Sequence, residues 1–297
     1  MYSVSIKKDI YDIYILSDDL TSSVAEICPA RGGILRSFVS KGTELLYLDQ
    51  TTFNDPLKNI RGGNPILFPI CGQLPDERYS FNDRGYFMKN HGFARNNPWT
   101  VLDYGVSPFG SAAFLKIGLT STLETLDCYP FDFRLVFTYT LCNGKLTISQ
   151  SITNTTCCSC DTDNSKMPVQ TGFHPYFKML GKQLCHNIKS RECFDYNDMQ
   201  SKNFPNPYDA SDKAEAVVVR PETSECIDFY ELNNPDCKIR LTYSPQYKYI
   251  MLWAQDGSDF ICVEPWTARN QEFLRGDELI LVESGQKINL FMSIERI

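Results

Sequence analysis

Four short stretches place ionisable or amide side chains next to glycine or proline inside otherwise apolar sequence. They are RGGNPILFPICGQLPD (residues 61–76), HGFARNNPW (91–99), TGFHPYF (171–177) and ICVEPW (261–266). A glycine or proline beside a polar residue is typical of a strand end or a β-bulge, where a side chain can be aimed into a cleft. We therefore expect these stretches to form the edges of one functional site.

Glu264 and His174 are the residues in these stretches best suited to acid–base chemistry. Glu264 follows an apolar run and precedes a Pro-Trp pair, a setting in which a carboxylate loses hydration and its pKa rises. A carboxylate of this kind suits a general base. The alternative interpretation is structural, with Glu264 pointing to solvent at a strand end and the two nitrogens of His174 hydrogen-bonded within the core.

Two arginines and a second histidine could contact a ligand. Arg61 is followed by two glycines, and Arg95 is preceded by Gly-Phe-Ala, so small residues leave room for a ligand close to the backbone. His91 could donate a hydrogen bond to a ligand, or could simply occupy the turn before the next glycine. For both arginines the alternative is a surface ion pair, because the chain has 36 Asp and Glu residues.

The elements that must position these residues are predicted to be β-strands. Segments such as FRLVFTYTL (133–141), KLTISQSIT (145–153) and INLFMSIE (288–295) are rich in β-branched and aromatic residues and alternate in polarity. Asn-Gly at 143–144 predicts a hairpin turn between the first two. Strong amphipathic helices are not expected, although TARNQEFLRGDE (267–278) could contain a helical turn.

This pattern predicts an all-β fold. Many strands without intervening helices imply two packed antiparallel sheets, each with one buried face. We expect a large antiparallel β-sandwich that forms a single domain over residues 1–297. The polar stretch CSCDTDNSKMP (158–168) is expected to be a long loop within this domain.

The cysteines are expected to be mostly reduced. The chain has 12 of them and lacks an export signal. Cys157, Cys158 and Cys160 could ligate a soft metal, but a second Cys/His pair at suitable spacing is missing, which favours a cluster in a polar loop. We therefore expect no metal.

Composition and charge limit the partners. With 42% hydrophobic and 22% charged residues the chain is typical of a soluble globular protein, and its net charge of −7 argues against a nucleic-acid partner. Charges interrupt every apolar run in residues 1–19, and no stretch approaches the ~20 apolar residues of a membrane span. We expect a cytoplasmic protein with no membrane partner, either a monomer or a homodimer.

The four stretches, taken in order, resemble conserved segments of the aldose 1-epimerase (galactose mutarotase-like) family. GGNPILFPICGQLPDERYSFNDRGY resembles the family's Gly-x-Pro-x-Leu-Phe-Pro block and its following hairpin, and HGFARNNPW is similar to the His-Gly-Phe-Ala-Arg segment. MPVQTGFHPYF resembles the stretch with the catalytic histidine, and ICVEPW the one with the catalytic glutamate. Four motifs in the correct order are a specific match that extends over most of the chain.

The resemblance implies interconversion of the α and β anomers of an aldose, without metal or organic cofactor, on a large antiparallel β-sandwich. By analogy, Glu264 accepts the proton of the C1 hydroxyl while His174, kept as an imidazolium by the nearby carboxylate, protonates the ring oxygen. Rotation about C1–C2 and closure with reversed roles then give the other anomer. Because a neutral sugar needs one proton donor and one acceptor, we expect the two side chains to face each other across one sugar ring.

The resemblance also suggests residues that bind the sugar. His91 matches the family's second histidine, which binds sugar hydroxyls. The family places an aspartate from a later strand against the sugar, for which Asp228 is the candidate and Asp195 the fallback. Where many members have an arginine, this chain has Gln73, so a fixed cation is lost although an amide donor remains.

The substrate is expected to be a hexose or a hexose phosphate. Arg61 and Arg95 match arginines that the hexose-6-phosphate branch of the superfamily uses for the phosphate. One alternative is a non-catalytic carbohydrate-binding or sensor protein on the same fold, but the presence of both His174 and Glu264 favours turnover. A glycoside hydrolase would need two carboxylates flanking the scissile bond, and only Glu264 lies in a convincing motif.

Overall fold

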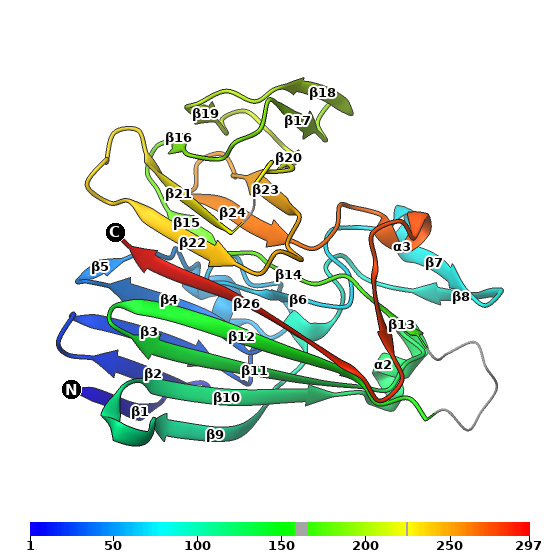
Figure 1. The fold of residues 1–297 in the computed structure, drawn as a ribbon, viewed down its shortest axis with the longest axis horizontal. Coiled ribbons are helices and arrows are strands. Elements are labelled where there is room, and N and C mark those ends of the chain that lie inside the picture. Colours follow the sequence, from blue (N-terminus) through cyan, green and yellow to red (C-terminus); the bar gives the residue numbers. More distant parts are fainter. Residues whose placement is uncertain (158–165, 224) are drawn as a thin grey trace.

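The computed structural model describes residues 1–157, 166–223 and 225–297 (Figure 1). Cys158, Cys160 and most of the loop expected at 158–168 lie outside the described residues. The last part of that stretch is not loop, because strand β13 (Lys166–Val169) begins within it. The cysteines from Cys28 to Cys142 and from Cys185 to Cys262 carry free thiols.

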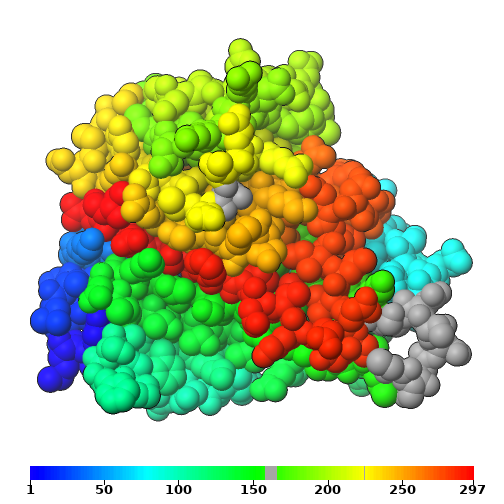
Figure 2. All heavy atoms as spheres, in the orientation of Figure 1, coloured from blue at the N-terminus to red at the C-terminus, as the bar shows by residue number. Residues whose placement is uncertain are grey.

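The largest sheet has nine strands and lies across the front of the molecule in Figure 1. In spatial order it consists of β19 (Tyr208–Asp209), β16 (Gln183–His186), β21 (Cys226–Glu231), β22 (Ile239–Tyr243), β26 (Lys287–Arg296), β12 (Lys145–Asn154), β11 (Phe133–Cys142), β10 (Ala113–Thr120) and β9 (Thr100–Val106). The C-terminal strand β26 therefore pairs between β12 and β22, and in the space-filling view its red atoms separate the green strands from the yellow ones (Figure 2).

Strands β11 and β12 show how the sequence forms this sheet. Along β11, buried residues alternate with more exposed ones from Phe133 to Cys142, as expected for a strand with one face in the core. The strands pair in antiparallel register from Phe133 opposite Asn154 to Cys142 opposite Lys145. Asn143 and Gly144 form the predicted turn, both with positive φ (52° and 74°), which matches the twist of the flanking strands.

A second sheet of eight strands carries the residues of chemical interest. Its order is β18 (Gln200–Asn203), β17 (Glu192–Asp195), β20 (Val217–Val219), β23 (Tyr249–Trp253), β24 (Phe260–Trp266), β14 (Gly172–Phe173) and β6 (Ile66–Leu67), and β15 (Tyr176–Lys178) also pairs with β24. Strand β24 has all seven residues buried. It therefore runs through the interior, covered on both faces.

The remaining strands form three smaller sheets, and the helices are short. A five-stranded sheet comprises β1 (Tyr2–Lys8), β2 (Asp12–Asp18), β3 (Ser23–Cys28), β4 (Ile34–Ser40) and β5 (Thr43–Glu44); β7 (Arg78–Phe81) pairs with β8 (Arg84–Phe87), and β13 with β25 (Ile280–Glu283). The helices are α1 (Gln50–Asn54), α2 (Leu123–Cys128) and α3 (Glu272–Arg275), with 3₁₀ turns η1 (Pro75–Glu77), η2 (Ala94–Asn96) and η3 (Pro108–Gly110).

These elements confirm the expected all-β, antiparallel fold. Every pairing between the named strands is antiparallel, and α3 supplies the helical turn predicted within residues 267–278. Among the described residues, no helix is both long enough and apolar enough to cross a membrane.

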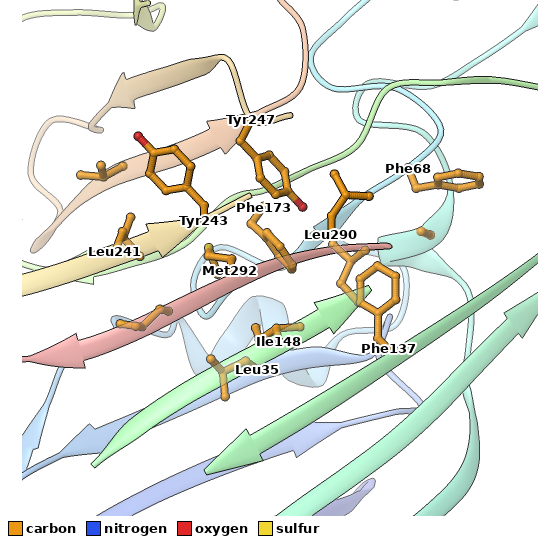
Figure 3. Packing of buried hydrophobic residues seen from close by; sticks show 14 of the residues in the cluster. Leu35, Phe68, Phe137, Ile148, Phe173, Leu241, Tyr243, Tyr247, Leu290 and Met292 are labelled. Atoms are coloured by element: carbon orange, nitrogen blue, oxygen red, sulfur yellow. The ribbon is translucent and has the colours of Figure 1, made fainter. Parts of the chain in front are cut away.

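The main hydrophobic core joins buried residues of the nine-stranded, eight-stranded and five-stranded sheets. Phe137 of β11 and Phe173 of β14 are fully buried, with ring centroids 6.3 Å apart, and Tyr247 lies 6.2 Å beyond Phe173 (Figure 3). The buried Tyr247 hydroxyl donates a 2.6 Å hydrogen bond to Oε1 of Gln150, so it is not left without a partner. The core thus anchors Phe173, the residue immediately before His174.

Backbone pairing brings the four polar stretches together. Gly172 lies opposite Leu67 on one side and Trp266 on the other, which joins three of them in one sheet. The fourth joins through a bridge between Gly92 and Phe68, where the amide of Phe93 donates a 3.0 Å hydrogen bond to the Phe68 carbonyl. The common edge expected from sequence is therefore built by main-chain contacts.

The buried core should be far more sensitive to truncation than the outer face of the same sheet. We expect Phe137→Ala to reduce the free energy of unfolding by about 3–5 kcal/mol, because it removes a fully buried ring and leaves a cavity. Phe291→Ala on β26, where the ring is 38% exposed, is the control and should cost less than about 1 kcal/mol. Urea unfolding followed by circular dichroism measures both, and equal losses would contradict this description of the core.

Candidate active site

The four polar stretches surround a cavity of about 240 Å³. This volume is below the range typical for drug-sized ligands, so it suits a smaller molecule. Loops and strands from distant parts of the chain form its walls, which are lined by Arg61, Gly72, Gln73, Asn90, His91, His174, Ala214, Glu215, Ala216, Met251, Trp253, Glu264, Trp266 and Asn270.

Glu264 and His174 are in direct contact within the wall of this cavity. Nδ1 of His174 lies 3.4 Å from Oε1 of Glu264, and both side chains are more than nine-tenths buried. The other carboxylate oxygen, Oε2, accepts a 3.1 Å hydrogen bond from the indole nitrogen of Trp266. Glu264 and Trp266 are two residues apart on β24 and therefore project from the same face of the strand.

This contact corrects one expectation from the sequence. We expected the two side chains to face each other across the width of a sugar ring, but a separation of 3.4 Å leaves no room for one between Nδ1 and Oε1. They form one surface instead. The imidazole is held there by stacking on the ring of Tyr176, two residues along the chain, with centroids 4.7 Å apart and planes inclined by 9°.

Burial opposes the ionisation of both groups. It raises the pKa of Glu264 well above its usual value, and the Trp266 hydrogen bond and the Arg95 charge offset this only in part. Burial and the positive charges of Arg95 and Arg61 lower the pKa of His174 to about 3. The direction for the glutamate agrees with the raised pKa expected from the sequence, whereas burial and two cations oppose the imidazolium expected at His174.

His91 is held as a neutral hydrogen-bond donor. The amide of Gly72 donates a 2.9 Å hydrogen bond to Nδ1 of His91, so Nδ1 carries no proton and the neutral ring is protonated at Nε2. Burial, followed by the charge of Arg95, lowers the pKa of His91 well below its usual value. The ring lies edge-on to those of His174 and Trp266, with centroid distances of 5.2 and 5.6 Å.

The two arginines take different places. Arg61 is exposed at the cavity and lies over the ring of Trp253, 5.6 Å from its centroid. Arg95 lies behind the wall, where Nη2 donates a 2.9 Å hydrogen bond to the carbonyl of Asn90. Burial lowers the pKa of Arg95 to about 10, so it remains a cation at neutral pH. Arg61 can therefore touch a ligand directly, whereas Arg95 acts on the wall through its charge.

Gln73 lines the cavity as expected, and it is accompanied by a residue that sequence reasoning missed. Its backbone amide donates a 3.3 Å hydrogen bond to Oδ1 of Asn270, which also lines the cavity. Asn270 follows β24 in a segment interpreted only as a helical turn, so only the folded chain reveals its place. Asn90 was missed as well, although its position directly before His91 was a usable signal.

The structure does not bring Asp228 to the cavity. Asp228 lies on β21 of the nine-stranded sheet, where Nε and Nη2 of Arg240 hold its two oxygens at 2.6 and 2.8 Å. Its fallback, Asp195 on β17, is bound by Lys202 and Lys213 at 2.8 and 3.0 Å. Neither lines the cavity. Each carboxylate is occupied by local cations, so the expectation of a sugar-binding aspartate at either position is corrected.

One group of buried side chains has the composition of a metal site. His174, Cys262 and Glu264 each bring one potential ligand atom to within 4.8 Å of the others. Burial raises the pKa of Cys262 well above its usual value, which holds it as a thiol, and the thiolate is the form that binds metals. The charges of Arg61 and Arg95 also oppose a divalent cation here. The raised pKa of Cys262 and the nearby arginines thus disfavour a divalent cation at these three residues.

Comparison with known proteins identifies the family. The profile of the family described as aldose 1-epimerase matches residues 16–295. The chain belongs to this family. Its fold is similar to that of the Slr1438 protein from Synechocystis sp. PCC 6803, with 30% identity, 99% of each chain covered and a TM-score of 0.89. A galactose mutarotase related enzyme from Lactobacillus acidophilus shares the fold at a TM-score of 0.75 and 17% identity, over 96% of this chain and 97% of that one.

Two curated relatives of this aldose 1-epimerase family member share about a quarter of its residues. The chromosomal LacX protein of Lactococcus lactis subsp. lactis is 25% identical over 282 residues, 84% of this chain and 86% of that protein. The Escherichia coli (strain K12) protein named "Putative glucose-6-phosphate 1-epimerase" is 26% identical over 217 residues, 68% of this chain and 63% of that protein.

The protonation states described above can be tested by nuclear magnetic resonance, because the chain has only three histidines. We expect the rings of His174 and His91 to stay neutral from about pH 8 to about pH 5, and His91 to carry its proton on Nε2. In the unfolded chain these rings bind protons below about pH 6.5, so their burial should lower stability as the pH falls through that value.

Ring ¹⁵N shifts measure these states directly. His174→Gln and His186→Gln assign the signals, and His186, whose Nε2 lies 3.0 Å from the Pro205 carbonyl outside the cavity, provides a second buried ring for comparison. An imidazolium signal from His174 at neutral pH would overturn this account.

Proposed function

We propose that the protein interconverts the α and β anomers of a hexose by acid–base ring opening and closure, with Glu264 as base and His174 as acid. The observation that carries the proposal is the buried contact between His174 and Glu264 in the wall of a cavity for a small molecule. Membership of the aldose 1-epimerase family supports it independently. Such a reaction needs one group with a proton to give and one that can accept a proton.

The pair can supply both the donor and the acceptor by moving one proton between its two members. In the uncharged pair this proton is on Glu264. Its transfer from Oε1 to Nδ1 of His174, which lie 3.4 Å apart, produces a carboxylate and an imidazolium without a proton from water. Glu264 then takes the proton of the C1 hydroxyl while the C1–O5 bond breaks and His174 protonates the ring oxygen. The C1 oxygen becomes the aldehyde oxygen of the open chain.

Closure reverses these steps on the other face of the aldehyde. After rotation about C1–C2, the C5 hydroxyl attacks C1, His174 recovers its proton from that hydroxyl, and Glu264 returns a proton to the C1 oxygen. Each turnover leaves the pair with the protons it began with. Each proton transfer by a positioned side chain of this kind accelerates a reaction roughly 10²–10⁴-fold.

Neutral hydrogen-bonding groups are available to hold the sugar. Nε2 of His91 is a donor, and the side-chain amides of Gln73, Asn90 and Asn270 line the same cavity. Trp253 adds an aromatic side chain, which suits the apolar face of a sugar ring. This combination supports a polyhydroxylated ligand.

Polarimetry of freshly dissolved α-glucose and α-galactose tests the reaction. Glu264→Gln should lower the rate of mutarotation at least ~10²-fold, because the amide cannot accept the C1 proton, and His174→Gln should have a similar effect. His186→Gln removes a histidine outside the cavity and should retain the wild-type rate. Full activity of Glu264→Gln would refute the mechanism. Sugar binding without acceleration by the wild type would favour the non-catalytic sensor.

A hexose 6-phosphate is the second candidate substrate. Arg61 is an exposed cation on the cavity lining, and a guanidinium is well suited to a phosphate. The name of the Escherichia coli relative supports the same class of substrate. Arg95 fits this role less directly, since it lies behind the wall rather than on it.

The contribution of Arg61 can be separated from catalysis by comparing two substrates. If Arg61 binds the phosphate, Arg61→Gln should lower kcat/KM for glucose 6-phosphate by about 10- to 100-fold, the range for a lost hydrogen bond to a charged group, and should affect glucose much less. Arg78→Gln is the control, because Arg78 lies over Phe87 on the β7–β8 hairpin, outside this cavity. Equal losses for both sugars would exclude a phosphate-specific role.

A further inference from the structure

The two oxygens of the Glu264 carboxyl group are in different environments. Oε2 accepts the hydrogen bond from Nε1 of Trp266 at 3.1 Å, and Oε1 lies 3.4 Å from Nδ1 of His174. An indole N–H can donate but cannot accept a hydrogen bond. Oε2 must therefore present a lone pair to Trp266, and a proton on this carboxyl group is favoured at Oε1.

We propose that Trp266 is a positioning residue, which commits Oε2 and leaves Oε1 as the single atom through which Glu264 exchanges protons with the sugar and with His174. This inference rests on the proposed function. It explains why the base is followed two residues later by a tryptophan, since that spacing places both side chains on one face of β24.

The indole is fixed by close backbone contacts on both sides. A Cβ atom on Gly172 would lie 2.8 Å from Cδ1 of Trp266, and one on Gly72 would lie 3.2 Å from its Cζ3. Gly172 is also the backbone partner of Trp266 in the sheet. Because the backbone passes this close, the ring has little room to turn, and the N–H keeps its direction toward Oε2.

Several other titratable groups lie near the Glu264 carboxyl group. They come from three segments packed around β24 and from β24 itself, and they are His174, Tyr176, Arg95, Cys71 and Cys262. His91, Arg61 and Glu215 line the same cavity. Opposite Glu264 on β23 lies Met251, which is uncharged. The hydrogen bond that Oε2 accepts comes from the Trp266 N–H.

Removing the indole N–H should change both rate and pH dependence. Trp266→Phe keeps an aromatic ring but leaves Oε2 without its donor, so the carboxyl group can turn and its carboxylate form is less stabilised. We expect kcat to fall about 10-fold or more with a smaller change in KM, and the basic limb of the pH–rate profile, where the pair loses its proton, to move to higher pH. Trp253→Phe is the matched control. Its indole donates to the Ala214 carbonyl at 3.1 Å, so the basic limb should not move.

A double-mutant cycle separates positioning from direct contact with the sugar. In the Glu264→Gln background, Trp266→Phe should add little further loss, because the group through which Trp266 acts is already absent. A loss as large as in the wild-type background would show that Trp266 acts on the substrate independently, and would overturn the proposal.

Infrared spectroscopy tests the same point without turnover. The protonated carboxyl band that disappears in Glu264→Gln reports Glu264, and its titration midpoint should rise in Trp266→Phe and stay unchanged in Trp253→Phe. A wild type without mutarotase activity would refute the proposed function but would leave this measurement valid. If Trp266→Phe does not fold, Trp266→Met lacks the N–H as well and should give the same rise. An unchanged midpoint in a folded variant would refute the positioning role.

Discussion

The carboxyl group of Glu264 is buried in the middle of a strand that is itself covered on both faces. A carboxylate in this position is costly unless hydrogen bonds or opposite charges compensate it. Here one oxygen accepts a hydrogen bond from the indole of Trp266, the other lies 3.4 Å from Nδ1 of His174, and Arg95 contributes a positive charge from behind the wall. Trp266 is on the same strand as Glu264, but His174 and Arg95 come from segments far away in the chain, so the environment of one side chain requires the correct pairing of β6, β14 and β24.

That pairing also explains the glycines of the polar stretches. Gly92 has a φ of 70°, and a Cβ on it would lie 2.2 Å from the carbonyl oxygen of Phe68, to which the next residue donates its amide. A Cβ on Gly72 would lie 1.4 Å from Oδ1 of Asn270, and the backbone amide of Gly72 donates the hydrogen bond to Nδ1 of His91. The glycines thus let loops meet closely enough for backbone amides to orient functional side chains.

The sequence predicted the fold and the gathering of the polar stretches because both depend on local patterns. Alternation along Phe133–Cys142 identifies a half-buried strand, and Gly or Pro beside polar residues marks strand ends. The choice of Asp228 failed because nothing near it in sequence shows that its neighbour across the sheet, Arg240, occupies its carboxylate. The two cations that oppose an imidazolium at His174 were missed for the same reason, since Arg61 and Arg95 approach it only in the folded chain.

The electrostatics of the wall are consistent with the kind of reaction proposed. Burial disfavours net charge on either Glu264 or His174, so a reaction that took up or released a proton at each turnover would have to charge the wall repeatedly. Ring opening and closure only pass protons between the pair and the sugar. The total number of protons on Glu264, His174 and the sugar therefore stays constant. In the described part of the chain the lining carries two exposed charges of opposite sign, Arg61 and Glu215. Charges at the rim thus remain available for substrate recognition, while the buried pair exchanges protons in the proposed reaction.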